Sequence, residues 1–107
     1  MWAWHKRATE RGDIPTVPAI VVAETWRGGR SRLREVLAAC EVEHMDERLA
    51  RIAGEALGSL RLDNAIDAVV MASAAQRGDV VLTSDAGDLM RFAGYFRDIR
   101  VIDLARS

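Results

Sequence analysis

The chain contains a single cysteine, two prolines and no long apolar segment. Cys40 therefore cannot form an internal disulfide, and its Ala-rich surroundings favour a small buried thiol over a nucleophile. Scarce proline and a hydrophobic content of 50% exclude a disordered chain. No apolar run approaches the ~20 residues that a membrane-spanning helix needs, and the opening MWAWHKRATERGD lacks the apolar region of a secretory signal. We expect a globular protein in a reducing cytoplasm.

An excess of positive charge is also missing, because the formal net charge is −1. This balance excludes the global basic field of a protein that coats nucleic acid non-specifically. Lysine occurs once, at Lys6, and every other basic residue is arginine. Four of these arginines cluster in WRGGRSRLR, namely Arg27, Arg30, Arg32 and Arg34. The guanidinium fork suits phosphate, although a solvated helix face is the simpler explanation of such a cluster, so binding of nucleic acid needs a second, independent feature.

The length of 107 residues fits one domain, residues 1–107. Apolar spacing and capping residues predict helices over 1–11, 19–29, 31–40, 47–57, 64–78 and 88–96. Short apolar runs predict strands at 80–83 and 99–104 and an edge strand near Val42, whereas 14–18 is too short and too rich in proline for a long central strand. Helices that alternate with short apolar strands predict an α/β fold, a parallel sheet covered on both faces.

Three acidic positions are unusual because they lie among apolar residues. Glu24 lies within AIVVAETW and Asp67 within AIDAVVMASAA, while Asp85 follows the strand VVLT, with Asp88 three residues further on. Each also has a purely structural interpretation. Asp67 can complement the N-terminus of a helix that starts after Asn64, Asp85 and Asp88 can be N-cap and N3 of the next helix, and Glu24 can extend into solvent from a helix end.

Taken together, the three acidic positions favour a ligand-binding site over three separate structural roles. Carboxylates are rarely buried unless they are paired or bind metal, and ligands bind at the carboxyl ends of parallel strands. An oxygen-only cluster selects a hard cation, Mg²⁺ or Mn²⁺, with the hydroxyl of Thr83 or Ser84 as an auxiliary polar group. His5 and His44 have no partner at metal or triad spacing, so we expect both at the surface or rim.

These segments resemble a known family, the PIN domain, and within it the VapC-like ribonuclease toxins of prokaryotic toxin–antitoxin pairs. PAIVVAETWRGG is similar to the segment of the family's second acid, here Glu24. LRLDNAIDAVVMASAAQRG is similar to the helix of its third acid, Asp67, and VVLTSDAGDLMRFA to its TSDxxD element with Asp85 and Asp88. The resemblance covers essentially the whole chain and rests on the order and spacing of all three segments.

The resemblance implies a three-layer sandwich with a Mg²⁺- or Mn²⁺-dependent endoribonuclease site, which cleaves RNA phosphodiester bonds by metal-activated water. Glu24, Asp67 and Asp85 would be the catalytic metal ligands, Asp88 a further ligand, and Ser84 an auxiliary group. It also implies a homodimer and a cognate VapB-like antitoxin that inhibits the site. The phosphates of the RNA would contact Arg27, Arg30 and Arg32.

One departure from the family concerns the first strand. Family members begin with a central strand that ends in an Asp, which is the first metal ligand. Before Glu24 the sequence offers Asp13, which has no apolar run ahead of it. We therefore expect the first central strand to be absent and the domain to be N-terminally incomplete, through a late start codon, a fragment or a degenerate gene. Repacking, exchange with a second copy or a strand from a partner would close the gap.

The sequence leaves two functions open. The first is the metal-dependent ribonuclease toxin, and the alternative is a truncated, inactive PIN-like module that binds antitoxin or RNA. A receiver-like α/β domain is disfavoured, because the lysine that would partner its phosphoacceptor Asp is missing.

Overall fold

The computed structural model describes residues 3–6, 14–26, 28, 33–83, 87, 89–96 and 99–103. Along the chain, the elements of this part are β1 (Ala3–Lys6), β2 (Thr16–Pro18), α1 (Ala19–Thr25), α2 (Leu33–Ala38), β3 (Glu41–Glu43), α3 (Glu47–Leu60), α4 (Ala65–Arg77), β4 (Val80–Thr83), α5 (Leu89–Phe96) and β5 (Val101–Asp103).

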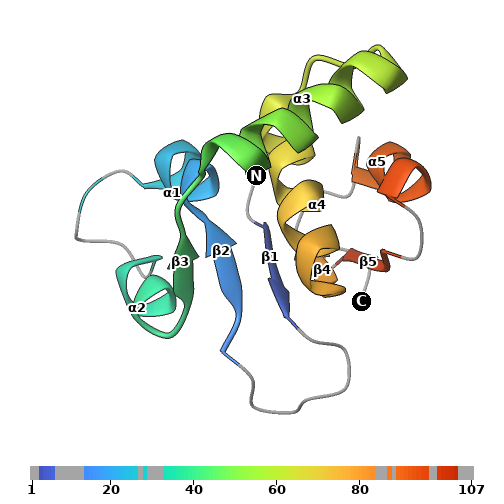
Figure 1. Ribbon diagram of the computed structural model, residues 1–107. Coiled ribbons are helices and arrows are strands. Elements are labelled where there is room, and N and C mark those ends of the chain that lie inside the picture. Colours follow the sequence, from blue (N-terminus) through green and yellow to red (C-terminus); the bar gives the residue numbers. More distant parts are fainter. Residues whose placement is uncertain are drawn as a thin grey trace.

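A five-stranded sheet, in the order β3-β2-β1-β4-β5, forms the middle of the molecule (Figure 1). β2 pairs in parallel with β3, and β4 pairs in parallel with β5. The central strand β1 pairs antiparallel with both β2 and β4. It follows that the four outer strands share one direction and that β1 runs against them.

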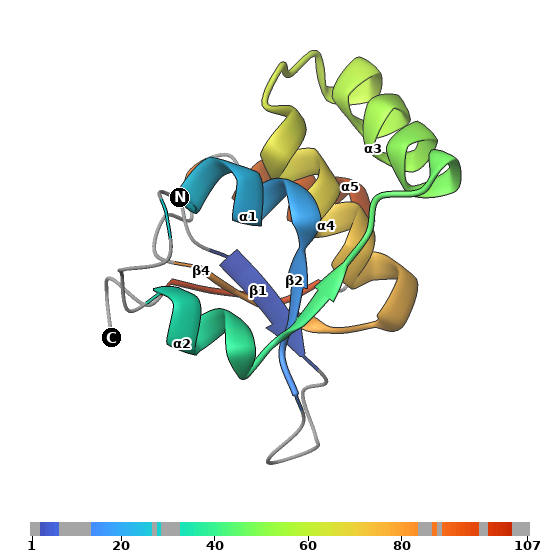
Figure 2. The ribbon, with the colours of Figure 1, turned by 90° about the vertical axis from the view of Figure 1, so that its left-hand side faces the viewer.

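Helices cover both faces of this sheet. α4 lies across the sheet and contacts β1, β2 and β4, while α3 and α5 pack against α4. α1 contacts β2 and α4, and α2 contacts β3. Figure 2 shows α2 and α4 on opposite sides of the sheet. The predicted α/β fold class, a short and mostly parallel sheet flanked by helices, is therefore confirmed.

α4 is surrounded by protein on nearly every side, which explains why its sequence is apolar all round. Every residue from Asp67 to Ala74 is buried, between the sheet on one side and α3 and α5 on the other. The largest buried side chains of this core are Met71 of α4 itself and, around it, Phe92, Leu49 and Leu89. Burial of this kind, at about 25 cal/mol per Å² of apolar surface, is the main source of stability.

The predicted start of α3 and both predicted ends of α4 are confirmed by their caps, whereas α3 continues past its predicted end at 57 to Leu60, where Arg61 adopts the left-handed conformation. Asp46 accepts a hydrogen bond from the N–H of Leu49 at 2.8 Å and so starts α3. Gly78 ends α4 in the left-handed region at φ 68°, where its N–H donates to the carbonyl oxygen of Ala74. Pro18 is the N-cap residue of α1, and β3 is an edge strand as predicted.

The helix predicted over 1–11 is wrong, because Ala3–Lys6 forms β1. This segment occupies the central position of the sheet, between β2 and β4, and it runs antiparallel to both neighbours. An empty position there would leave the buried N–H and C=O groups of both neighbours unpaired, at about 1–3 kcal/mol each. That penalty outweighs the local helical preference of a short segment, which is below about 1 kcal/mol per residue.

Candidate active site

The carboxyl ends of β2, β4 and β5 meet at one edge of the sheet. β2 continues directly into α1, and the parallel register places Thr83, the last residue of β4, beside Asp103, the last residue of β5. β1 begins at the same edge, since Ala3 pairs with Thr83. Because α/β folds bind ligands beyond the carboxyl ends of their parallel strands, this edge is the candidate active site.

Asp67 is in the first turn of α4. In Figure 1 this turn is at the upper end of α4, toward the same edge of the sheet. Its side chain is buried, with 4% of the residue exposed. Asn64 caps the helix by accepting a hydrogen bond from the N–H of Asp67 at 3.1 Å, and the amide Nδ2 of Asn64 donates to Asp67 Oδ2 at 2.8 Å. Asp67 therefore lies in the first turn of α4, where its charge complements the helix N-terminus, and the same two bonds fix the direction of its buried carboxyl group.

Glu24 lies in the last turn of α1 and is half-buried. α1 packs against α4, so the two helices that carry Glu24 and Asp67 are neighbours. The adjacent Thr25 directs its hydroxyl into its own helix, where Oγ1 donates to the carbonyl oxygen of Val21 at 2.8 Å. Intermediate burial is compatible with both interpretations of Glu24, a ligand or a side chain at the rim.

Thr83 is fully buried at the end of β4, and Asp103 is half-buried beside it on β5. Sequence reasoning singled out Thr83 but did not single out Asp103. The sequence does indicate Asp103, because the apolar run in IRVIDL leads into this acid, much as the strand VVLT is followed by Asp85. The register of β5 on β4 is what brings Asp103 to the candidate edge.

Several predicted site residues lie outside the described part of the chain, namely Ser84, Asp85, Asp88, Arg27, Arg30 and Arg32. Among the residues that the structure does describe, no group of three His, Cys, Asp or Glu side chains is placed to hold a metal ion. The structure thus brings Asp67, Thr83 and Asp103 to one edge, with Glu24 on an adjacent helix. The donors available there are oxygen atoms, which suit a hard divalent cation.

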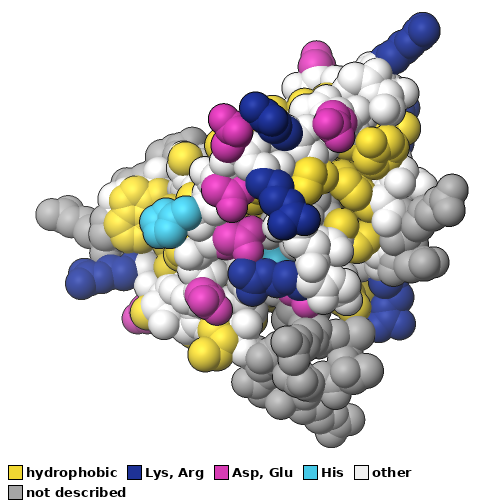
Figure 3. Space-filling model, viewed as in Figure 1, with side chains coloured by type: hydrophobic (Ala, Val, Ile, Leu, Met, Phe, Trp, Pro, Cys, Tyr) yellow, Lys and Arg dark blue, Asp and Glu magenta, His cyan; other side chains and the backbone are white. Residues whose placement is uncertain are grey.

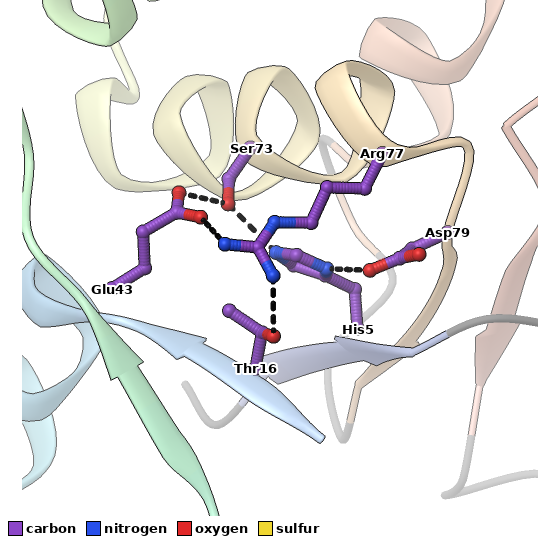
Figure 4. Close-up of polar contacts among 6 residues, drawn as sticks. All are labelled: His5, Thr16, Glu43, Ser73, Arg77 and Asp79. Atoms are coloured by element: carbon purple, nitrogen blue, oxygen red, sulfur yellow. Dashed lines mark hydrogen bonds and ion pairs between the residues drawn. The ribbon is translucent and has the colours of Figure 1, made fainter. Parts of the chain in front are cut away.

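A second polar group, the His5 cluster, lies between the sheet and α4 (Figure 4), and it extends from Asp79, just before β4, to Glu43 at the carboxyl end of β3. It consists of His5, Thr16, Glu43, Ser73, Arg77 and Asp79. His5 Nδ1 lies 2.5 Å from Asp79 Oδ2, and His5 Nε2 lies 2.7 Å from Ser73 Oγ. Ser73 Oγ is 2.6 Å from Glu43 Oε1. The cluster therefore connects β1, β3, α4 and the start of β4.

Arg77 closes the cluster at its rim. Its guanidinium donates to Glu43 Oε2 at 2.5 Å and to Thr16 Oγ1 at 3.3 Å. The Arg77 side chain is 43% exposed and that of Glu43 is 16% exposed, so this end of the cluster meets solvent. The other end is enclosed, because the side chains of His5 and Asp79 are 0% and 4% exposed.

The expectation that His5 lies at the surface or rim is wrong, whereas His44 is exposed as expected. Burial lowers the pKa of His5 from its ordinary value, while Asp79 and Glu43 oppose this by favouring the charged imidazolium and Arg77 adds to it. His5 is therefore a buried imidazole whose proton is held less firmly than in water. Burial also raises the pKa of the Cys40 thiol, in agreement with the prediction of an unreactive cysteine.

Asp79, His5 and Ser73 follow one another in the order of a nucleophilic triad. A nucleophilic serine must reach its substrate, and Ser73 is 0% exposed in the interior of α4. The cluster is therefore part of the packed structure, where it holds β1 to α4, and its serine does not meet a substrate in this conformation.

The face shown in Figure 3 carries acidic and basic side chains interspersed over α3 and α4. Glu47 and Arg51 form one exposed pair at 3.2 Å on α3, and Glu43 with Arg77 forms another. Alternating signs agree with the net charge of −1. Among the described helices, none is long and apolar enough to cross a membrane.

Comparison with known protein families gives one match, in which the model described as PIN domain covers residues 2–94. Comparisons with curated proteins and with solved structures give no match. The matched segment contains β1 and most of α5, and it includes Glu24, Asp67 and Asp85.

Proposed function

Because the chain belongs to the PIN-domain family, whose members are generally nucleases, we propose that it is a metal-dependent endoribonuclease of the VapC-like toxin type. The observation that carries this proposal is the family match across 2–94, a range that holds all of the acidic positions singled out in the sequence. The buried and oriented carboxyl group of Asp67 at the carboxyl edge of the sheet supports it.

PIN-domain nucleases typically use divalent metal ions, and the donors at the candidate edge fit such an ion in kind. Carboxylate and hydroxyl oxygens are the ligands of Mg²⁺ and Mn²⁺. Glu24, Asp67 and Asp85 would hold the ion, with Asp88 as a fourth ligand and Thr83 or Ser84 as an auxiliary hydroxyl. When bound, a divalent cation activates water and stabilises the charge of a phosphodiester under attack.

The chain's own residues supply positioning in this proposal. Asn64 holds Asp67 Oδ2, which keeps one carboxylate oxygen fixed and directs the other. Burial at the edge excludes bulk water, so the interaction of carboxylates with a cation is stronger there than in solvent. Arg27, Arg30 and Arg32 would bind RNA phosphates, and a VapB-like antitoxin and a second copy of the chain would be the protein partners.

The proposal is tested by RNA cleavage with the purified chain in Mg²⁺, in Mn²⁺ and after chelation. We expect cleavage that needs the cation and that falls at least about a hundredfold in Asp67→Asn and Asp85→Asn, since even residues that only support a ligand cost 10–100-fold. Asp63→Asn is the matched control, because Asp63 is exposed and precedes the same helix. Far-UV circular dichroism establishes that each variant is folded. Cleavage that persists in chelator, or in both Asn variants, would refute the proposal.

The second candidate is an inactive PIN-like module that binds RNA or an antitoxin. The arginine-rich segment with Arg27, Arg30 and Arg32 would be its binding surface. In that case RNA or antitoxin would bind with equal affinity in Mg²⁺ and in chelator, and no cleavage would accompany binding.

A further inference from the structure

The His5 cluster contains more short polar contacts than there are hydrogens available to form them as hydrogen bonds, if His5 is neutral and both carboxyl groups are ionised. Three contacts in series join Asp79 to His5, His5 to Ser73, and Ser73 to Glu43, at 2.5, 2.7 and 2.6 Å. A contact this short between two polar atoms needs one hydrogen between them. The Ser73 hydroxyl supplies one hydrogen and a neutral imidazole supplies one, whereas ionised carboxylates supply none.

A third hydrogen is therefore needed for all three contacts to exist together. With His5 as an imidazolium, Nδ1–H donates to Asp79, Nε2–H donates to Ser73, and the Ser73 hydroxyl is free to donate to Glu43. With a neutral imidazole whose Nδ1–H donates to Asp79, Nε2 becomes an acceptor. Ser73 then gives its single hydrogen to His5, and two oxygens face each other at the contact with Glu43.

The contact between Ser73 and Glu43 is the one that can separate. Its Glu43 end lies at the rim, with 16% of that side chain exposed, and the second carboxylate oxygen is held by the half-exposed Arg77. Asp79 and His5 are enclosed at the other end and have no comparable access to solvent. Movement of Glu43 costs little, while separation of Asp79 from His5 would leave buried polar atoms unpaired.

We propose that the Ser73 hydroxyl is a proton-controlled switch, which donates to Glu43 while His5 is protonated and to His5 while the imidazole is neutral. Acidification would therefore close the contact of Ser73 on α4 with Glu43 on the edge strand β3, and neutral pH would open it, while Arg77 keeps its bond to Glu43. The arrangement in Figure 4, with all three contacts short, is the protonated form.

The groups that face His5 from each surrounding element support this assignment. Asp79 precedes β4, Glu43 is on β3, Ser73 and Arg77 are on α4, and Thr16 is the partner of His5 on β2. With an imidazolium the two carboxylates and two cations sum to zero, whereas a neutral imidazole leaves a net charge of −1 in the cluster. Burial opposes the protonated form by lowering the pKa of His5, so the switch operates below pH 6.5.

Nuclear magnetic resonance of the full chain tests the switch directly. The ring ¹⁵N signals of His5 report its protonation, and the side-chain carboxyl ¹³C signal of Glu43 reports whether Ser73 donates to it. We expect the Glu43 signal to show an inflection at the midpoint of the His5 titration. Above this midpoint Nδ1 should carry the hydrogen and Nε2 should have the shift of an unprotonated nitrogen.

Two variants separate this coupling from a merely structural contact. Ser73→Ala removes the shared hydroxyl, so the Glu43 inflection should be lost while His5 still titrates. Glu43→Gln supplies the third hydrogen from its own amide and removes a negative charge near His5, so the pKa of His5 should fall below that of the wild type. Glu41→Gln is the matched control on the same strand, because Glu41 is exposed and outside the cluster, and it should leave the His5 titration unchanged.

Three results would overturn the proposal. The first is a Glu43 signal with no inflection at the His5 midpoint, and the second is an inflection that survives in Ser73→Ala. The third is an unchanged His5 titration in Glu43→Gln, which alone decides the matter if Ser73→Ala does not fold. None of these measurements depends on nuclease activity, so they stand or fall apart from the proposed function.

Discussion

At the N-terminus of α4, Asn64 makes two hydrogen bonds with Asp67, one to its backbone and one to its side chain. The sequence predicted that Asp67 can lie in the first turn of a helix that starts after Asn64, where negative charge is favourable, but it did not predict the hydrogen bonds between the two residues. It also predicted burial, since the helix has almost no polar face. Local spacing was enough to place Asp67 because both residues lie within one helical turn.

Substitution of Asn64 separates its two roles. Asn64→Ala should lower the free energy of unfolding by about 1 kcal/mol through loss of the cap and lower RNA cleavage by roughly 10–100-fold through loss of the support for Asp67. Asn64→Ser keeps an acceptor for the Asp67 N–H but lacks the amide, so stability should be largely restored while cleavage stays low. Urea unfolding and an RNA cleavage assay measure the two effects, and full activity in Asn64→Ser would contradict the supporting role.

His5 shows where residue-level prediction fails. Its partners are distant in sequence, Ser73 at a separation of 68 residues and Asp79 at a separation of 74. A search for metal or triad spacing along the chain cannot find such partners, because topology brings them together. The arginines of the proposed RNA contact and the acids of TSDxxD remain predictions, since they lie outside the described residues.

At the scale of elements, most helices and the strands β3, β4 and β5 were predictable, whereas β2 and the central strand β1 were not. α3 and α4 carry caps and apolar spacing that define both ends. β1 carries no such signal, because four residues with a Trp, a His and a Lys fit a helix as readily as a strand. Its conformation follows from the backbone pairing that β2 and β4 require on either side.

Two glycines in these helices should respond in opposite ways to alanine. Gly78 has φ 68°, and a Cβ there meets no atom within 4 Å, so Gly78→Ala should destabilise through backbone strain alone, by about 1–2 kcal/mol. Gly54 lies inside α3 and its Cβ would also meet nothing within 4 Å. Gly54→Ala should therefore stabilise by about 0.5–1 kcal/mol. Urea unfolding of both variants checks the pair, and a stabilised Gly78→Ala would refute the left-handed cap.

For the whole molecule, stability should depend on pH through His5. Because burial lowers the pKa of His5 in the folded chain, the unfolded chain binds this proton more firmly. The contribution of neutral His5 is therefore fully present above pH 6.5 and is lost as the pH falls through the folded value. Unfolding free energy measured from pH 7.5 to 5 should fall with acidification, and the slope should be smaller in His5→Gln.

His44→Gln is the control for this pH dependence, since His44 is exposed on the loop after β3. It should keep the slope of the wild type. An identical slope in His5→Gln would show that other groups cause the acid sensitivity. The same comparison at high salt distinguishes burial from surface charge, because exposed charges are screened and a buried imidazole is not.

The reversed central strand also has a consequence for the order in which the molecule assembles. Ala3 pairs with Thr83 and Lys6 pairs with Val80, so the first strand of the described chain cannot dock on this side until β4 has been synthesised. Closing a loop of that length is slow relative to local helix formation. During synthesis, the edge of β1 that later pairs with β4 would remain open to strands from other chains, and mutations that loosen β1 should increase aggregation of newly made protein more than they reduce the stability of the folded molecule.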